Sequence, residues 1–286
     1  MASLTLTDPR TKQVALKVTP FTDDSLFNSL KKYNCFSMLL VSKGRGTVQR
    51  DETQYAFNSG CLLSFAIYQP FMVKPADAVE GVLVNFHPSF FCLFKHRQEV
   101  SCNGVLFNNL YDTPVAELTP GDLRSLSVIV DQISSEMQRR QQPDQDVLLS
   151  YLKVFLMEAS RAKIEQREGA QPVKAPLTLE NLRTAIETHY KTLHSPGDYG
   201  DLLHISTKAL NKACKAHFDK TLTDLIAERL IIEAKRELYL TAKSVKEIAF
   251  ELGYEDEFYF SRYFKKKVGV SPQIFRDTVG FDKLTA

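Results

Sequence analysis

Two stretches in the last third of the chain decide its fold: STKALNKACK at residues 206–215 and DEFYFSRYFK at residues 256–265. Each begins with a residue that commonly caps helices, Ser206 or Asp256. Counted from that cap, both carry apolar residues at +4 and +8, a small polar residue at +5 and bases at +6 and +9. Because residues four apart share one face of a helix, both stretches predict a short helix with one buried side and one basic side.

A second, shorter helix is predicted before each of these stretches. Ser195-Pro196-Gly197-Asp198 begins one that ends near His204, and the capping box Ser244-Val245-Lys246-Glu247 begins another that Gly253 is suited to end. A short helix, a brief turn and a second capped helix form a helix-turn-helix motif, so we expect two such motifs. The long amphipathic stretch 222–240 would join them as a strut, about one turn of DNA (~34 Å) apart.

The outward faces of the two second helices carry the candidate DNA contacts. A helix fits the major groove, where Arg, Lys and Asn can bind base edges, so we expect Arg262 to bind guanine and Asn211 to bind adenine. A lysine on a helix is most often only a solvated residue. The repetition of cap, apolar and basic positions together favours DNA binding. The candidates from this pattern are Lys208, Asn211, Lys212, Lys215, Tyr259, Arg262, Lys265 and Lys266.

Composition limits the other possibilities. The chain has 286 residues, of which 44% are hydrophobic and 24% charged, as in folded globular proteins. A formal net charge of +2 is too small to indicate nucleic-acid binding by itself. The five cysteines show no metal-ligand spacing. The sequence lacks a long apolar run and a hydrophobic signal core, so we expect a cytoplasmic protein that does not enter a membrane.

The N-terminal half predicts an antiparallel β-structure. Six short strands separated by turn residues are expected at 35–41, 47–50, 53–57, 61–65, 71–74 and 82–86, as in a sandwich or small barrel. Thr119-Pro120-Gly121-Asp122 begins a helix with a seam of two heptads, and a second helix at about 146–164 completes a hairpin. Intramolecular packing and a dimer interface are equally good interpretations of that seam.

These features divide the chain into four parts. We expect a β-domain at 1–118, a helical hairpin at 119–165, a polar linker rich in Pro and Gly at 166–176, and a helical domain at 177–286 whose first helix is capped by Thr178.

The C-terminal part resembles the DNA-binding domain of AraC-type transcriptional regulators. The resemblance lies in residues 230–238, 244–254 and 258–266, followed by Gly269-Val270-Ser271-Pro272 and Phe275-Arg276. It implies base contacts by Lys208, Asn211 and Lys212 in the first motif, and by Phe258, Tyr259 and Arg262 in the second. Phe258 departs from the family, where a small polar residue is usual, so it could pack on a thymine methyl or a deoxyribose. Cys214 stands where the family often has Phe.

By the same resemblance, the N-terminal half is similar to a cupin-like β-barrel sensor domain followed by a dimerisation pair of helices. Cupin enzymes hold a metal through several histidines, but residues 34–86 contain none and only His87 and His96 follow, so we expect no metal and no cofactor. A metal-free barrel can still bind a small-molecule effector in its mouth. The candidate effector contacts are Arg50, Tyr55, Tyr68, Lys74 and Phe86.

The sequence therefore predicts a homodimeric regulator of transcription that binds double-stranded DNA, with RNA polymerase as a further partner, and no enzymatic activity. One alternative is a metal-free cupin-type small-molecule enzyme with the helices as an oligomerisation module. Another is an adaptor whose basic helices bind an acidic protein. Motifs of the common enzyme classes, such as G-x-x-x-x-G-K-[ST] or G-x-S-x-G, are absent.

Overall fold

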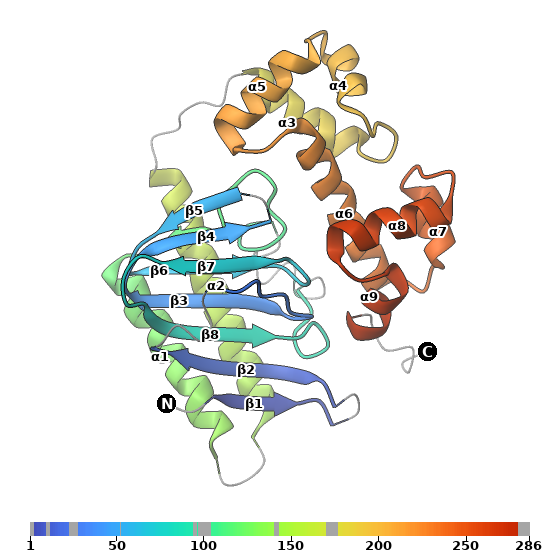
Figure 1. Cartoon of the computed structure of the whole chain (residues 1–286). Helices are drawn as coiled ribbons and strands as arrows, with labels where there is room; N and C mark the ends of the chain where they lie inside the picture. Colours follow the sequence, from blue (N-terminus) through green and yellow to red (C-terminus); the bar gives the residue numbers. More distant parts are fainter. Residues whose placement is uncertain are drawn as a thin grey trace. The chain divides into compact units, whose positions relative to one another are not determined.

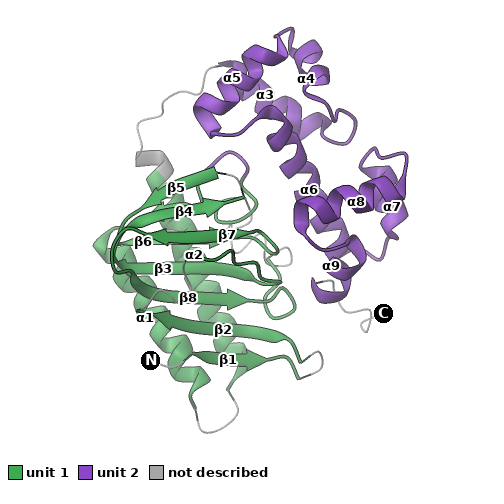
Figure 2. Cartoon of the chain, in the orientation of Figure 1, with its two compact units in different colours: residues 1–109, 113–170 green, residues 110–112, 171–286 purple. Residues whose placement is uncertain are grey.

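A computed structural model gives the fold, and it describes residues 3–9, 12–22, 28–51, 53–93, 96, 104–139, 143–169 and 177–279. The chain forms two compact units (Figures 1 and 2). The first contains residues 1–109 and 113–170, and the second contains residues 110–112 and 171–286. The first unit therefore includes both the β-structure and the helical hairpin. No helix in the described part of the chain is long and apolar enough to cross a membrane.

The first unit is built on two antiparallel sheets. The larger has the strand order β1-β2-β8-β3-β6-β9 and the smaller has the order β5-β4-β7 (Figure 1). The strands are β1 (Leu4–Thr7), β2 (Val14–Phe21), β3 (Phe36–Lys43), β4 (Gly46–Arg50), β5 (Thr53–Phe57), β6 (Cys61–Phe65), β7 (Phe71–Pro75), β8 (Glu80–Phe86) and β9 (Val115–Glu117).

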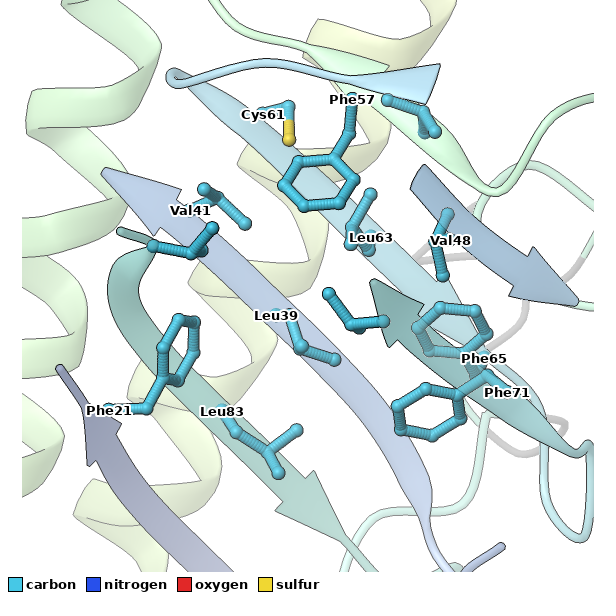
Figure 3. Packing of buried hydrophobic residues seen from close by; sticks show 13 residues of the cluster. Phe21, Leu39, Val41, Val48, Phe57, Cys61, Leu63, Phe65, Phe71 and Leu83 are labelled. Atoms are coloured by element: carbon cyan, nitrogen blue, oxygen red, sulfur yellow. The ribbon is translucent and has the colours of Figure 1, made fainter. Parts of the chain in front are cut away.

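Buried side chains from both sheets meet in one apolar core (Figure 3). Leu39 and Val41 on β3 contribute to it together with Val48 on β4, and the rings of Phe65 and Phe71 stack with centroids 3.9 Å apart. Since side chains alternate along a strand, the neighbours of Leu39 on β3 are buried on the other face of the larger sheet. The larger sheet therefore has two covered faces.

A helical hairpin covers the second face of the larger sheet. Its helices, α1 (Pro120–Met137) and α2 (Gln145–Gly169), contact each other, and they contact β1, β3 and β9 of the larger sheet. Leu126, Val130 and Ile133 of the predicted seam are buried. The seam is thus used for packing within the chain. The buried Lys163 on α2 donates a hydrogen bond to the carbonyl oxygen of Val115 on β9.

The six predicted strands are confirmed, with bounds that differ by at most two residues at either end. Strands β1, β2 and β9 were not predicted, and α2 is longer at its C-terminal end than expected. Of the predicted linker, residues 166–169 are the last turn of α2, and residues 170–176 lie outside the described part. The structure shows two antiparallel sheets, the larger of which is covered by helices, but not the closure of a barrel.

The second unit is helical. Its helices are α3 (Leu177–His189), α4 (Pro196–Leu203), α5 (Thr207–Phe218), α6 (Leu222–Leu240), α7 (Val245–Glu251), α8 (Glu257–Val268) and α9 (Pro272–Val279). Helix α6 contacts every other helix of this unit. It is buried on most sides, and Leu230 and Ala234 are among its buried residues. It therefore forms the shared core of α4–α5 and α7–α8.

The predicted helix starts are confirmed with one exception. Ser195 and Ser244 form capping boxes with Asp198 and Glu247, and Ser206 and Asp256 cap α5 and α8. The prediction for Thr178 was wrong, because α3 begins one residue earlier and Thr178 lies within its first turn.

Three residues from the segment before β9, Leu110–Asp112, pack within the second unit. The Tyr111 hydroxyl donates to Oε1 of Glu187 on α3 at 3.2 Å, and its ring lies against that of Phe218 on α5. The buried Lys220 ammonium donates to the carbonyl oxygen of Leu110 at 3.2 Å and pairs with Glu228 at 2.6 Å. No sequence pattern predicted this segment.

Candidate nucleic-acid interface

The second helix of each motif has one buried side and one exposed side, as predicted. Leu210 and Cys214 are fully buried on α5. The equivalent residues of α8, Phe260 and Phe264, are also fully buried. The Phe264 ring also meets that of Phe275 on α9 edge-on, with centroids 5.7 Å apart. These apolar contacts fix the rotation of each helix about its axis and thereby determine which side chains face outward.

The predicted basic residues lie on the exposed sides. Lys208, Lys212 and Lys215 are exposed on α5, and Arg262, Lys265 and Lys266 are exposed on α8. Phe258 and Tyr259 are exposed at the start of α8. None of the six bases makes an ion pair with an acid in the part of the chain that the structure describes. Each helix thus presents three cations to the solvent, and Lys267, which was not a candidate, adds a fourth on α8.

Asn211, the remaining candidate on α5, is held by hydrogen bonds inside the domain. Its Nδ2 donates to the carbonyl oxygen of Thr207 at 3.1 Å, and its Oδ1 accepts from the backbone N–H of Leu222 at 3.0 Å. That N–H lies in the first turn of α6, which has no partner for it within the helix. The side chain of Asn211 therefore ties α5 to the start of α6.

Other bases of the second unit are bound by acids. Glu233 on α6 is 3% exposed and accepts from Arg229 at 3.1 Å and from Arg236 at 2.8 Å. Arg229 also pairs with Glu187 at 2.8 Å, and its guanidinium lies 3.8 Å from the centre of the Tyr190 ring. Hydrogen bonds from this guanidinium compensate the buried carboxylate. The network joins α3 to α6, and its arginines are already paired with acids of the protein.

Two acids at helix starts are likewise bound within the protein, by hydrogen bonds from the capping residues. The hydrogen bonds from Ser195 lower the pKa of the Asp198 carboxyl, and those from Ser244 lower the pKa of the Glu247 carboxyl. Each carboxylate accepts the backbone N–H of its capping residue, at 2.9 Å for Asp198 and 2.6 Å for Glu247. Both acids thus stabilise the first helix of a motif.

Two residues of the AraC-like sequence signature have structural roles, of which only that of Gly253 was predicted. Arg276 on α9 donates to the carbonyl oxygens of Leu238 at 3.4 Å and Lys243 at 2.5 Å, so it closes the turn between α6 and α7. Gly253, as predicted, adopts a left-handed conformation after α7, with φ of 81°. A Cβ there would overlap the carbonyl oxygen of Lys191.

Two of the five candidate effector residues contact each other directly. Arg50 and Tyr55 lie together: Nη2 of the buried Arg50 donates to the Tyr55 hydroxyl at 3.0 Å, and Tyr55 packs on the core between the sheets. The fully buried ring of Phe86 belongs to an aromatic cluster with Phe36 and Phe107, and its contact with an effector stays a prediction. Tyr68 lies in the turn after β6, and Lys74 lies on β7 beside the buried Val73.

His87 and two of the cysteines fit structural roles. Nδ1 of the buried His87 lies 2.7 Å from Oγ of Ser89 and accepts from the backbone N–H of the same residue at 3.2 Å. Burial raises the pKa of the Cys35 and Cys61 thiols to about 12. Cys102 lies outside the described residues. In the described part of the chain, no three His, Cys, Asp or Glu side chains are grouped so that they could hold a metal ion.

Comparisons with known proteins identify the second unit. Residues 199–278 match a family model described as a helix-turn-helix domain. The HTH-type transcriptional regulator YfiF of Bacillus subtilis is 32% identical over 144 residues, which are 49% of this chain and 43% of YfiF. The HTH-type transcriptional activator RhaR of Cronobacter sakazakii is 22% identical, over 85% of this chain and 84% of RhaR. For three of the curated relatives, YfiF included, the match spans less than half of the relative's length.

Among solved structures, wild-type ToxT from Vibrio cholerae with a bound unsaturated fatty acid aligns with 98% of this chain and 96% of its own. Its sequence identity is 16% and the TM-score is 0.42. The matched segment 199–278 runs from α4 into α9 and so includes both repeated motifs. Through these motifs the chain carries a helix-turn-helix domain and is similar to HTH-type transcriptional regulators.

Proposed function

We propose that this chain regulates transcription by binding a specific DNA sequence with α5 and α8, which enter successive turns of the major groove. The observation that carries this proposal is the pair of exposed basic helix faces without acidic partners in the described part of the chain, both packed on one buried helix. The 19 residues of α6 give it a length of about 28 Å, close to one turn of DNA. The matches to transcriptional regulators favour this function over the enzyme and adaptor alternatives.

The proposed contacts divide by chemistry. Arg262 is suited to bind a guanine edge with two hydrogen bonds, while the lysines are suited to bind phosphates. We assign Asn211 to positioning rather than to adenine, since both ends of its amide already hold α5 and α6 together. The proposed contact set is Lys208, Lys212, Lys215, Phe258, Tyr259, Arg262, Lys265 and Lys266.

Selection of duplexes from a random pool by the full chain tests this function directly. If about six phosphates are neutralised, affinity should fall roughly a thousandfold between 50 and 200 mM salt. Arg262→Ala should cost about 1–3 kcal/mol and relax the choice of one base pair, whereas Lys265→Ala should weaken binding to all sequences equally. Equal losses for Arg262→Ala on the selected and on random duplexes would refute base reading by this residue.

An effector and a dimer complete the proposal. Arg50 faces the space between the sheets, and a guanidinium pairs strongly with a carboxylate or phosphate, so we propose an anionic small molecule as the effector. Thermal stabilisation of the wild type, but not of Arg50→Met, by a member of a carboxylate library would support it. For the dimer, the exposed Val154 and Met157 lie three residues apart on α2. Light scattering on Val154→Asp tests whether this face joins two cytoplasmic protomers.

A further inference from the structure

Phe258 is the most exposed phenylalanine in the described part of the chain. It lies in the first turn of α8 and is 71% exposed. Its backbone is nevertheless fixed, because its N–H donates to Oδ1 of the capping residue Asp256 at 2.7 Å. The next residue, Tyr259, is 55% exposed, and its ring centroid lies 6.1 Å from that of the buried Tyr254. A rigid helix end thus holds a large apolar side chain in water.

The surroundings of Phe258 restrict what can cover it. Arg262 follows four residues later and Lys265 seven residues later, so the ring and these cations lie on the same face of α8. The opposite face is occupied by the buried Phe260 and Phe264. Burying the ring therefore also brings a row of positive charges against the partner. An apolar ring beside cations on one helix face fits a partner that is a polyanion and that displays an apolar group between its negative charges.

The major groove of DNA displays one apolar group at its base edges, the C5 methyl of thymine. A phenylalanine has no hydrogen-bonding group with which to read the polar edges, but it can pack on that methyl. We infer that Phe258 is a specificity-determining residue that selects thymine at one position of the DNA site through its methyl group. This inference rests on the proposed function and extends it to a residue with no polar atom in its side chain.

Deoxyuridine provides a direct test, because it differs from thymidine only in lacking this methyl. The full chain first selects a duplex from a random pool, and each thymine of that duplex is then replaced in turn by deoxyuridine. Loss of contact with one buried methyl should weaken binding about fourfold. Fluorescence anisotropy with the wild type should show this loss at one thymine of the sequence read by α8. With Phe258→Ser, the same replacement should leave the affinity unchanged.

Phe250 supplies a matched control, since it is also an exposed phenylalanine, on the preceding helix α7. Phe250→Ser should keep the full difference between thymine and uracil. Thermal unfolding should confirm that both variants fold, because each replaces an exposed side chain.

Three outcomes would overturn the inference. In the first, no deoxyuridine replacement weakens the wild type. In the second, Phe258→Ser weakens binding to the thymine and uracil duplexes equally, which would mean that the ring contacts the sugar rather than the methyl. Both outcomes leave the proposed function intact. In the third, selection enriches no duplex at all, which overturns the proposed function and this inference with it.

Discussion

Replacing Gly253 by alanine should destabilise the second unit more than the same replacement does at a turn glycine where an added Cβ has room. Gly253 joins the two helices of the second motif, with its N–H donating to the carbonyl oxygen of Phe250 at 3.0 Å. Two separate costs arise. The backbone has a positive φ of 81°, and an added Cβ would overlap the carbonyl oxygen of Lys191 and approach the ring of His194 to 3.1 Å.

The two costs can be sized and separated. A left-handed conformation costs a residue with a Cβ about 1–2 kcal/mol. Relieving an overlap with backbone atoms in a packed region costs about 1–3 kcal/mol more. Gly60 offers the matched control, because its φ is 73° but a Cβ there would meet only the carbonyl oxygen of Leu118 at 3.7 Å, an ordinary contact. We therefore expect a loss of about 2–5 kcal/mol for Gly253→Ala and about 1–2 kcal/mol for Gly60→Ala.

Hydrogen exchange read by mass spectrometry during a urea titration measures the unfolding midpoint of each unit separately, because each unit gives its own peptides. With a urea dependence of about 1–3 kcal/mol per molar, the midpoint for peptides of α7 and α8 should fall by at least about 0.7 M in Gly253→Ala. Peptides of the first unit should keep their wild-type midpoint. If the losses for Gly253→Ala and Gly60→Ala were equal, the overlap with Lys191 would not exist and the reasoning would fail.

Three further predictions follow from the second unit and the thiols. Asn211→Ala should destabilise the second unit by about 1–2 kcal/mol, as for loss of a helix cap, while Lys212→Ala should leave stability unchanged in the same urea titration. Burial raises the pKa of Tyr199 from 10.0 to about 12, so the folded state keeps a proton that the unfolded state loses above pH 10. Stability should therefore fall between pH 10 and 12, by about 3 kcal/mol from this residue, and Tyr199→Phe should show a correspondingly smaller fall. Burial also raises the pKa of the Cys214 thiol to about 11, so iodoacetamide at pH 8 should not modify the folded protein at this residue, and modification should appear in 8 M urea.

The helix starts of the second unit could be predicted because their signals are local. A capping box needs only two side chains three residues apart, and Ser195 and Ser244 meet that condition in the sequence itself. The buried positions on α5 and α8 follow from their spacing for the same reason. The strands β1, β2 and β9 carry weaker signals. β9 has three residues, and β2 contains Pro20, a residue that normally argues against a central strand.

The features that the sequence did not predict share a different cause, because they depend on contacts between distant residues. Asn211 has the sequence spacing of a base-reading residue, but its partner Leu222 is eleven residues away, and only the packing of α5 on α6 brings them together. Phe86 ends a predicted strand as a mouth residue would, yet the face it occupies depends on the pairing of β8 with β2 and β3. The placement of Leu110–Asp112 within the second unit likewise depends on Lys220 and Glu187, far along the chain.

The charge of the second unit shows why a nearly neutral domain can still bind DNA. Residues 176–286 contain 17 bases and 16 acids, which gives no useful prediction from net charge. The structure separates charged residues that are bound within the domain from those that face the solvent. Glu187 and Glu233 are bound by bases, and Asp198 and Glu247 by helix starts. These four acids thus help to hold the helices together, and the cations of α5 and α8 are left facing solvent. Since electrostatic interactions weaken over about 8–10 Å in salt, a DNA phosphate at these faces responds to the nearby cations rather than to the domain's net charge.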